Sequence, residues 1–275
     1  MDEKLGIIAG SGEIVHFILQ KFHREGSKVY LALIEGETSP EVTSLGAESH
    51  WFQVSDLNQI IQFFQDKGVQ KVFMLGKVRP ASIMGRPAEN NSFLSGMLNS
   101  LPDRSAKTLI SGAINYLASQ GLEVGDLTPY LQELFLPPGV VTRRKPTSLE
   151  EEDAQYGLFL ARQLADLEIG QTIVIKAKTV VAVEAMEGTD ETIKRAGLLA
   201  GQGTVVVKVG RTDQDNRIDL PVVGKQTIEA MKSAGSTALF IEQGKVAFLK
   251  PQKTIEIADQ EEMAIKVIAF PDQEE

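Results

Sequence analysis

The chain has 275 residues, of which 43% are hydrophobic and 24% charged, and its 37 acidic residues against 28 Lys and Arg give a formal net charge of −9. This balance is typical of a globular protein. The acidic excess argues against broad electrostatic contact with nucleic acid or with anionic lipid. Because a single hydrophobic core is near its useful limit at this length, we expect two domains.

The chain contains no cysteine and only three histidines. Disulfides, thiolate nucleophiles, iron–sulfur clusters and cysteine-based zinc sites are therefore excluded, and metal sites with several histidine ligands are strongly disfavoured. Chemistry must use carboxylates, Lys, Arg, hydroxyls, backbone amides and a hard metal ion, for which oxygen-ligated Mg²⁺ or Mn²⁺ is the class that the composition favours. The acidic N-terminus does not resemble a signal peptide, and no apolar run approaches the roughly 20 residues that span a bilayer. We therefore expect a cytoplasmic protein.

Strand-like and helix-like segments alternate through the first half of the chain, and this alternation predicts a mostly parallel sheet. The expected strands cover residues 5–9, 28–34, 50–54 and 71–75. The expected helices follow residue 12 to about 23 and cover 56–67, 105–120 and, as a shorter element, 127–135. Before the third of these helices, residues 79–102 contain three prolines and several Gly, Asn and Ser residues. Irregular segments of this length are usually functional.

A proline-rich break after this half predicts a domain boundary between residues 138 and 139, which divides the chain into domains 1–138 and 139–275. Ser148 to Glu151 has the spacing of a capping box for a helix that ends near residue 167. Beyond it we expect β-rich segments at 172–185 and 204–209, helices after Gly188 and at 225–234, a hairpin turned at Gln243-Gly244, and a final helix and strand. Because no simple βαβ order is apparent, a mixed α+β second domain is predicted beside the α/β first domain.

A glycine turn, Gly10–Gly12, follows the first strand and precedes a helix, where backbone amides can approach a phosphate. Val15 replaces the third glycine of the dinucleotide fingerprint, while Glu35 ends the second strand and could bind a ribose hydroxyl. Gly76 and Lys77 end a strand that we expect to be a neighbour in the same sheet. The turn and Glu35 suggest nucleotide binding, with a nucleotide-binding oxidoreductase as one alternative, but a tight turn without a ligand explains the glycines equally well.

Residues 182–190 read Ala-Val-Glu-Ala-Met-Glu-Gly-Thr-Asp and run from a strand into a helix that Thr189 or Asp190 would cap. Glu184, Glu187 and Asp190 fall within this one turn. Capping and a solvated strand face would account for any one of these acids, but three together suggest a site.

Residues 208–224 pack acids and bases between an apolar strand and a helix. A surface loop could have this composition, but Pro221 restrains Leu220 to extended geometry and so holds Asp219 in place. Lys208, Arg211 and Arg217 could neutralise a phosphate-containing substrate. Carboxylates beside such a substrate would repel it unless a divalent cation intervened, and Mg²⁺ fits that role.

These motifs resemble those of the UDP-2,3-diacylglucosamine pyrophosphatases of the LpxI type, over nearly the whole chain. The residues that match the family's motifs are Ile8 to Gly12, Gly76 to Val78, Gly170-Gln171, Ala182 to Asp190, and Lys208, Gln214, Asp215, Arg217, Asp219, Pro221 and Gly224. The sequence departs from the family at Arg211-Thr212, where Lys-Pro is usual. A match of this length by chance is improbable.

The resemblance implies a Rossmann-like N-terminal domain, a distinct C-terminal domain, and Mg²⁺-dependent hydrolysis of an amphiphilic UDP-sugar lipid to UMP and 2,3-diacylglucosamine 1-phosphate. It implies catalytic roles for Asp219, Lys208 and Arg217, with Asp219 and Asp215 as metal ligands. It implies substrate binding by Gly10, Ser11, Gly12, Lys77, Glu187, Thr189, Asp190, Arg211, Gln214 and Asp215. The acyl chains would need an apolar groove, for which apolar residues between 83 and 98 are candidates.

Two other functions stay open at this point, a nucleotide-binding oxidoreductase and a non-catalytic nucleotide-sugar-binding protein. The sequence contains no transmembrane segment, is compatible with peripheral contact with the inner membrane, and leaves a homodimer open.

Overall fold

The structure, a computed structural model, describes residues 4–78, 106–217 and 219–270. The chain forms two compact units. Unit 1 comprises residues 1–130 together with 216–218, and unit 2 comprises residues 131–215 and 219–275. The excursion predicted at 79–102, with its candidate acyl groove, lies outside the described residues.

Unit 1 is built on a parallel sheet of five strands in the order β3-β2-β1-β4-β5. The strands are β1 (Lys4–Ala9), β2 (Lys28–Ile34), β3 (Glu48–Phe52), β4 (Lys71–Leu75) and β5 (Glu123–Val124). The helices are α1 (Glu13–Arg24), α2 (Leu57–Asp66), α5 (Ala106–Ser119) and α6 (Thr128–Leu131), with a 3₁₀ turn at Pro40–Leu45. The 3-2-1-4-5 order matches the first five strands of doubly wound nucleotide-binding sheets.

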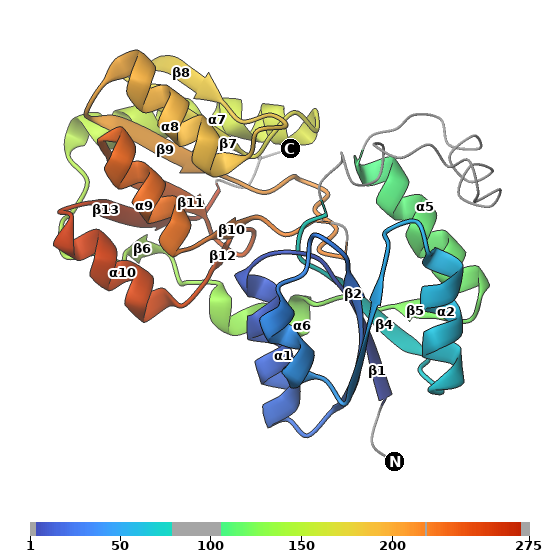
Figure 1. Cartoon of the computed structure of the whole chain (residues 1–275). Helices are drawn as coiled ribbons and strands as arrows, with labels where there is room; N and C mark the ends of the chain where they lie inside the picture. The colour runs from blue at the N-terminus through green and yellow to red at the C-terminus, as the bar shows by residue number, and fades with distance from the viewer. Residues whose placement is uncertain (1–3, 79–105, 218, 271–275) are drawn as a thin grey trace. The chain divides into compact units, whose positions relative to one another are not determined.

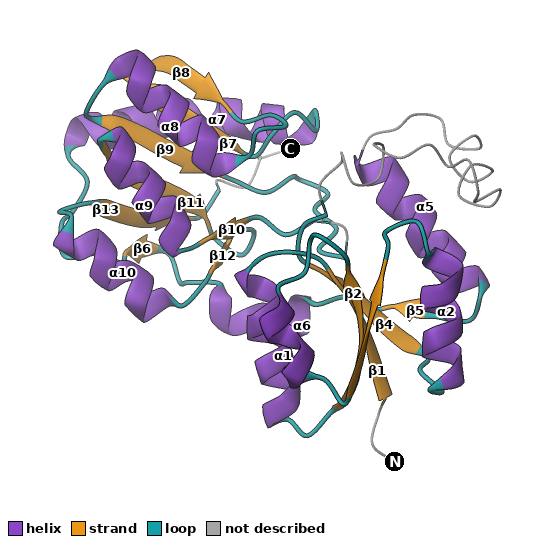
Figure 2. Cartoon of the chain, viewed as in Figure 1, coloured by secondary structure: helices purple, strands orange, loops and turns teal. Residues whose placement is uncertain are grey.

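Alternate residues of each strand point to opposite sides of this sheet, and their apolar side chains are buried by helices on both faces. Helices α2 and α5 cover one face, where Ile8 and Tyr30 of the sheet share a core with Phe64 and Leu117. Helix α1 covers the other face, where Phe22 contacts the ring of Phe73. Figures 1 and 2 show this three-layer arrangement. Because these strands are buried on both faces, their sequences are continuous apolar runs.

Unit 2 contains a mixed sheet of six strands in the order β6-β13-β11-β9-β7-β8, and a separate pair, β10 and β12. The strands are β6 (Gly139–Val140), β7 (Thr172–Lys176), β8 (Thr179–Val183), β9 (Thr204–Lys208), β10 (Val222–Val223), β11 (Ser236–Glu242), β12 (Ala247–Phe248) and β13 (Ala264–Ile268). The helices are α7 (Ser148–Asp166), α8 (Thr189–Ala200), α9 (Lys225–Ala234) and α10 (Pro251–Gln260), with a 3₁₀ turn at Gln132–Leu134. Helix α7 covers one face of the sheet and α8, α9 and α10 the other (Figure 2).

The predicted fold class is confirmed, with a mostly parallel first sheet and a separate mixed second one. The bounds predicted at 28–34, 71–75 and 225–234 agree with the structure to the residue. Two expectations for the second half are wrong. Strands β9, β11 and β13 are parallel and are joined by α9 and α10, so this region does contain a βαβ order. The chain after Gln243-Gly244 forms no hairpin with β11, because β12 pairs with β10 instead.

Helix starts in unit 2 also differ from the prediction. The N-cap of α7 is Thr147, whose hydroxyl accepts a hydrogen bond from the Glu150 amide while the Glu150 carboxylate accepts one from the Thr147 amide. The capping box therefore lies one residue before the predicted Ser148–Glu151 pair. Burial raises the pKa of Glu150, but hydrogen bonds from Arg144, Thr237 and Thr147 outweigh it and hold the pKa below its ordinary value. The N-cap of α8 is Gly188, so neither Thr189 nor Asp190 caps that helix.

Candidate functional site

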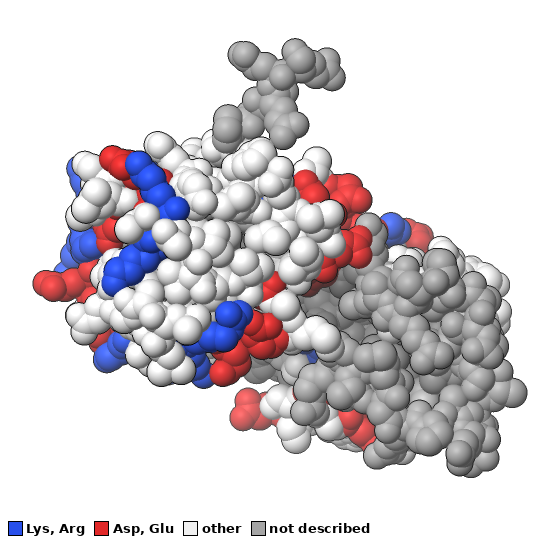
Figure 3. Space-filling model, turned by 90° about the horizontal axis from the view of Figure 1, so that it is seen from above, with Lys and Arg blue, Asp and Glu red and all other residues white. Residues whose placement is uncertain are grey.

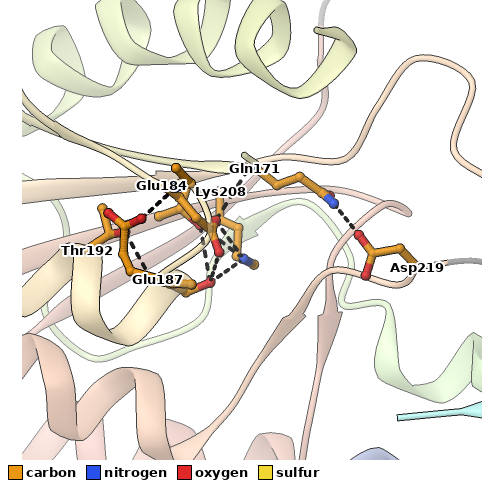
Figure 4. Close-up of polar contacts among 10 residues, drawn as sticks. Gln171, Glu184, Glu187, Thr192, Lys208 and Asp219 are labelled. Carbon is orange, nitrogen blue, oxygen red and sulfur yellow. Dashed lines mark hydrogen bonds and ion pairs between the residues drawn. The ribbon is translucent and has the colours of Figure 1, made fainter. Parts of the chain in front are cut away.

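A buried ion pair lies at the end of β9 in unit 2. Lys208 is only 4% exposed and Glu184 9%. The Lys208 Nζ donates hydrogen bonds to the hydroxyls of Thr172 (3.0 Å) and Thr189 (2.8 Å) and lies 3.7 Å from Glu184 Oε2. Antiparallel pairing of β7 with β9 places Thr172 opposite Lys208, and Figure 4 shows Glu184 beside the lysine. The positive charge that was predicted to neutralise a phosphate is therefore balanced within the unit.

Glu184 connects this pair to the start of β7. Its Oε1 accepts a hydrogen bond from the Thr189 hydroxyl (2.9 Å), and its Oε2 accepts one from the backbone amide of Gln171 (3.3 Å). The preceding residue is Gly170, where a Cβ would lie 2.1 Å from the Glu184 carbonyl oxygen. The glycine of the Gly-Gln motif is thus explained by close backbone approach.

Gln171 connects the ion pair to Asp219. Its Nε2 donates a hydrogen bond to Asp219 Oδ2, as drawn in Figure 4. The backbone of Asp219 is held as well, since its amide donates to the carbonyl of Asp215 (3.2 Å) and its carbonyl accepts from the Gln214 side chain. Among the described residues no side chain or amide donates to the other Asp219 oxygen, Oδ1. One carboxylate oxygen is therefore fixed and the other is available to a water, a metal ion or a substrate.

Glu187, predicted to bind substrate, makes its hydrogen bonds within the turn before α8 and to that helix. One of its oxygens accepts from Arg195 (2.6 Å) and Thr192 (3.3 Å), and the other from the amide of Ala185 (3.2 Å). The hydrogen bond from Arg195 lowers the pKa of the Glu187 carboxyl below its ordinary value. These contacts give Glu187 a structural role within the turn, and substrate binding by Glu187 stays a prediction.

The predicted residues of the 208–224 segment divide between two environments. Arg211, Gln214, Asp215 and Asp219 belong to unit 2, whereas Arg217 is exposed and groups with unit 1. Asp190 occupies the first turn of α8. The structure therefore brings together Lys208, Thr189, Gln214 and Asp219 through Glu184 and Gln171. The sequence indicated Glu184 only as one of three acids in a possible site, and it indicated Gln171 only as part of a motif.

The donor set suits Mg²⁺ better than a metal that requires a complete protein cage. No group of three or more His, Cys, Asp or Glu that could hold a metal ion exists among the residues described. Asp219 offers one oxygen, and the backbone contact between Asp215 and Asp219 places these two carboxylate-bearing residues on one turn. Because Mg²⁺ is commonly bound by one or two carboxylates together with waters and substrate phosphate, these residues fit it.

The glycine turn of unit 1 packs against the turn after β4. Strands β1 and β4 are neighbours, as predicted. The Ser11 amide donates to the Lys77 carbonyl (2.8 Å), the Lys77 amide donates to the Ser11 carbonyl (2.9 Å), and the Gly10 amide donates to the Leu75 carbonyl (2.7 Å). A Cβ at Gly10 would lie 2.4 Å from the Lys77 oxygen. Close backbone approach therefore explains Gly10, and the amides of Gly10 and Ser11 already have hydrogen-bond acceptors. Substrate binding by Gly10, Ser11, Gly12 and Lys77 stays a prediction.

On the face drawn in Figure 3, uncharged residues cover most of the described surface that is visible, and both basic and acidic side chains occur around them. Separately, no helix in the described part of the chain has both the length and the apolar character that crossing a bilayer requires.

Comparison with known proteins adds two family matches. Residues 4–134 match the LpxI N-terminal domain and residues 137–266 match the LpxI C-terminal domain. The chain is also similar to the UDP-2,3-diacylglucosamine pyrophosphatase LpxI of Caulobacter vibrioides, with 24% identity over 266 residues that cover 93% of this chain and 94% of that protein.

Similarity to solved structures is weaker. The biotin carboxylase domain of the Hydrogenobacter thermophilus 2-oxoglutarate carboxylase aligns with 73% of this chain and 42% of its own, at 13% identity and a TM-score of 0.30. UDP-glucose 4-epimerase of Thermotoga maritima aligns with 41% of this chain and 34% of its own, at 17% identity and a TM-score of 0.28. The chain thus spans less than half of either protein, and scores this low carry no inference about function.

Proposed function

Because the chain belongs to the LpxI family, we propose that it hydrolyses the diphosphate of UDP-2,3-diacylglucosamine, the compound in the name of its Caulobacter relative. The products would be UMP and 2,3-diacylglucosamine 1-phosphate, and the role a step of lipid A biosynthesis. The observation that carries the proposal is the Asp219 carboxylate, fixed through one oxygen by Gln171 and open at the other.

Hydrolysis of a diphosphate needs a water positioned against phosphorus and compensation of the negative charge that the two phosphates carry. In our proposal the open oxygen of Asp219 orients that water. The water adds to one phosphorus and passes a proton to the open Asp219 oxygen, while the bridging P–O bond breaks and the bridging oxygen leaves with the other phosphate. Gln171 has a positioning role: its hydrogen bond to Asp219 Oδ2 fixes the carboxylate, and Gln171 itself does not contact the substrate.

The buried pair of Lys208 and Glu184 stabilises the backbone from which Gln171 reaches Asp219. Glu184 accepts a hydrogen bond from the Gln171 amide while Lys208 neutralises Glu184. The start of β7 is thereby fixed, and with it the position of the Gln171 side chain. Lys208 thus contributes to the proposed site by holding it, since its charge is already balanced.

Mg²⁺ is the cofactor that we propose, with Mn²⁺ as a substitute that prefers the same oxygen ligands. Asp219 and Asp215 would hold it. When bound it would neutralise the charge of the diphosphate.

The proposal is tested by UMP release from UDP-2,3-diacylglucosamine, with added Mg²⁺ and, in a parallel reaction, with excess EDTA. We expect stoichiometric UMP and sugar 1-phosphate with Mg²⁺ and none with EDTA. Binding of the UDP-sugar without UMP release would instead identify a non-catalytic nucleotide-sugar-binding protein. Micromolar binding of NAD(H) without UMP release would identify an oxidoreductase.

A further inference from the structure

Arg211 is a buried cation without a counter-charge. It is 7% exposed, and its Nε is completely enclosed and has no hydrogen-bond acceptor. Two other buried cations lie in the described part of the chain, and both are paired: Lys208 with Glu184, and Arg162 with Glu242. No ion pair or side-chain hydrogen bond of Arg211 is found among the described residues.

Two acids, Glu242 and Asp166, bind the backbone on either side of Arg211. Glu242 accepts from Arg162 and from the amide of Gly210 (3.0 Å), the residue before Arg211. Asp166 accepts from the amide (2.7 Å) and the hydroxyl (2.8 Å) of Thr212, the residue after it. Both carboxylates therefore fix the backbone on either side of Arg211 and leave its guanidinium unpaired.

The backbone of Arg211 itself is also fixed. Its amide donates to the Gln214 side chain (3.0 Å), and its carbonyl accepts from Lys245 Nζ (3.0 Å), which also donates to the carbonyl of Thr212 (3.1 Å). The backbone from Gly210 to Thr212 is therefore held by side chains from four places: Gln214, the end of α7 (Asp166), the end of β11 (Glu242) and Lys245. Because this backbone is fixed in the free protein, little backbone conformational entropy would be lost when Arg211 binds a ligand.

A buried, unpaired charge destabilises a folded protein, and apolar residues in its place are commonly neutral or stabilising. We propose that Arg211 is the anion-binding residue of this segment and that its counter-charge is a diphosphate group. A guanidinium offers N–H donors in a planar fork that matches two oxygens of such a group. The identity of the anion as the substrate diphosphate rests on the proposed function. Among the predicted cations Lys208 is already neutralised, so Arg211 supplies positive charge that Lys208 cannot.

The test measures inorganic pyrophosphate binding by calorimetry, without divalent cations and without lipid substrate, to the full chain and to Arg211→Met. The matched control is Arg143→Met, whose arginine side chain is 90% exposed. We expect Arg211→Met to bind pyrophosphate roughly 10- to 100-fold more weakly than the wild type, the loss that corresponds to charge-assisted hydrogen bonds. We expect the control to bind as the wild type does.

The free proteins give a second readout. If the arginine has no partner without ligand, Arg211→Met should unfold at the same or a higher urea concentration than the wild type. Unchanged pyrophosphate affinity in Arg211→Met would overturn the proposal, and so would a free variant that unfolds much earlier, because the arginine would then have a structural role. Should Arg211→Met not fold, Arg211→Gln decides by the same affinity comparison. Because no turnover is measured, loss of this site and failure of the UMP assay are distinguishable.

Discussion

The buried pair of Lys208 and Glu184 allows a quantitative prediction. With the Lys208 Nζ 3.7 Å from Glu184 Oε2, an effective dielectric constant of about 20 gives an attraction of about 4 kcal/mol. Replacing one partner leaves the other charge buried, which typically costs about 3–5 kcal/mol. We therefore expect Lys208→Met and Glu184→Gln each to destabilise unit 2 by about that amount. The double variant should lose at least about 2 kcal/mol less than the sum of the two single losses.

The assay must report on unit 2. The chain has one tryptophan, Trp51 in β3 of unit 1, so intrinsic fluorescence follows the other unit. We propose amide hydrogen exchange of peptides from β7 and β9, whose slowest amides give the free energy of opening. The matched control is the exposed pair Lys194 and Glu191, with Nζ and Oε1 2.7 Å apart; exposed pairs typically contribute about 1 kcal/mol or less. Additive losses in the buried cycle, within about 0.5 kcal/mol, would refute the assignment of Lys208 as an internally balanced charge.

Three further predictions concern local structure. Gly10→Ala places a Cβ 2.4 Å from the Lys77 carbonyl, so unit 1 should lose about 1–3 kcal/mol in urea titrations followed by fluorescence; an unchanged midpoint would show that the two turns can separate freely. The pKa of Glu150 is lower in the folded protein, so its contribution to stability is present above its ordinary pKa of about 4.3 and is lost as the pH falls through the folded-state value. Glu150→Gln should therefore flatten the acid side of a stability–pH profile, and a profile of unchanged slope would contradict that cause. Glu187→Gln removes the negative charge that pairs with Arg195 and should lower the thermal stability of unit 2 while KM stays within about twofold of the wild type; a large rise in KM with unchanged stability would make Glu187 a substrate ligand.

The fold of unit 1 could be predicted well because its strands are buried on both faces. Such strands appear as uninterrupted apolar runs between turn residues, as in β2 and β4, and the chain order gives the parallel pairing. In unit 2 local signals had more than one meaning. The Gln243-Gly244 turn has hairpin composition, yet the partner of the following strand is Val222–Val223, twenty-odd residues earlier in the chain. Pairing of that kind is decided by tertiary contacts, which a local pattern does not contain.

The site was predicted in its residue types but not in its connections. Asp219 and Lys208 were named from their charge and their motif. Gln171 was quoted only as part of a motif, because an uncharged amide before a strand has many uses and nothing in its surroundings marks Asp219 as its partner. The balance of Lys208 by Glu184 was also missed, since the two residues are far apart in sequence and meet only through β7, β8 and β9.

In our proposal the Asp219 carboxylate acts on the water that hydrolyses the diphosphate. Single-turnover UMP formation from UDP-2,3-diacylglucosamine tests this role in Asp219→Asn beside Asp213→Asn, which replaces an exposed aspartate of the same segment. We expect a rate at least about 100-fold below that of the wild type for Asp219→Asn, with normal folding and retained substrate binding, and a rate near that of the wild type for Asp213→Asn. Equal rates for the wild type and Asp219→Asn would show that Asp219 has no part in the reaction.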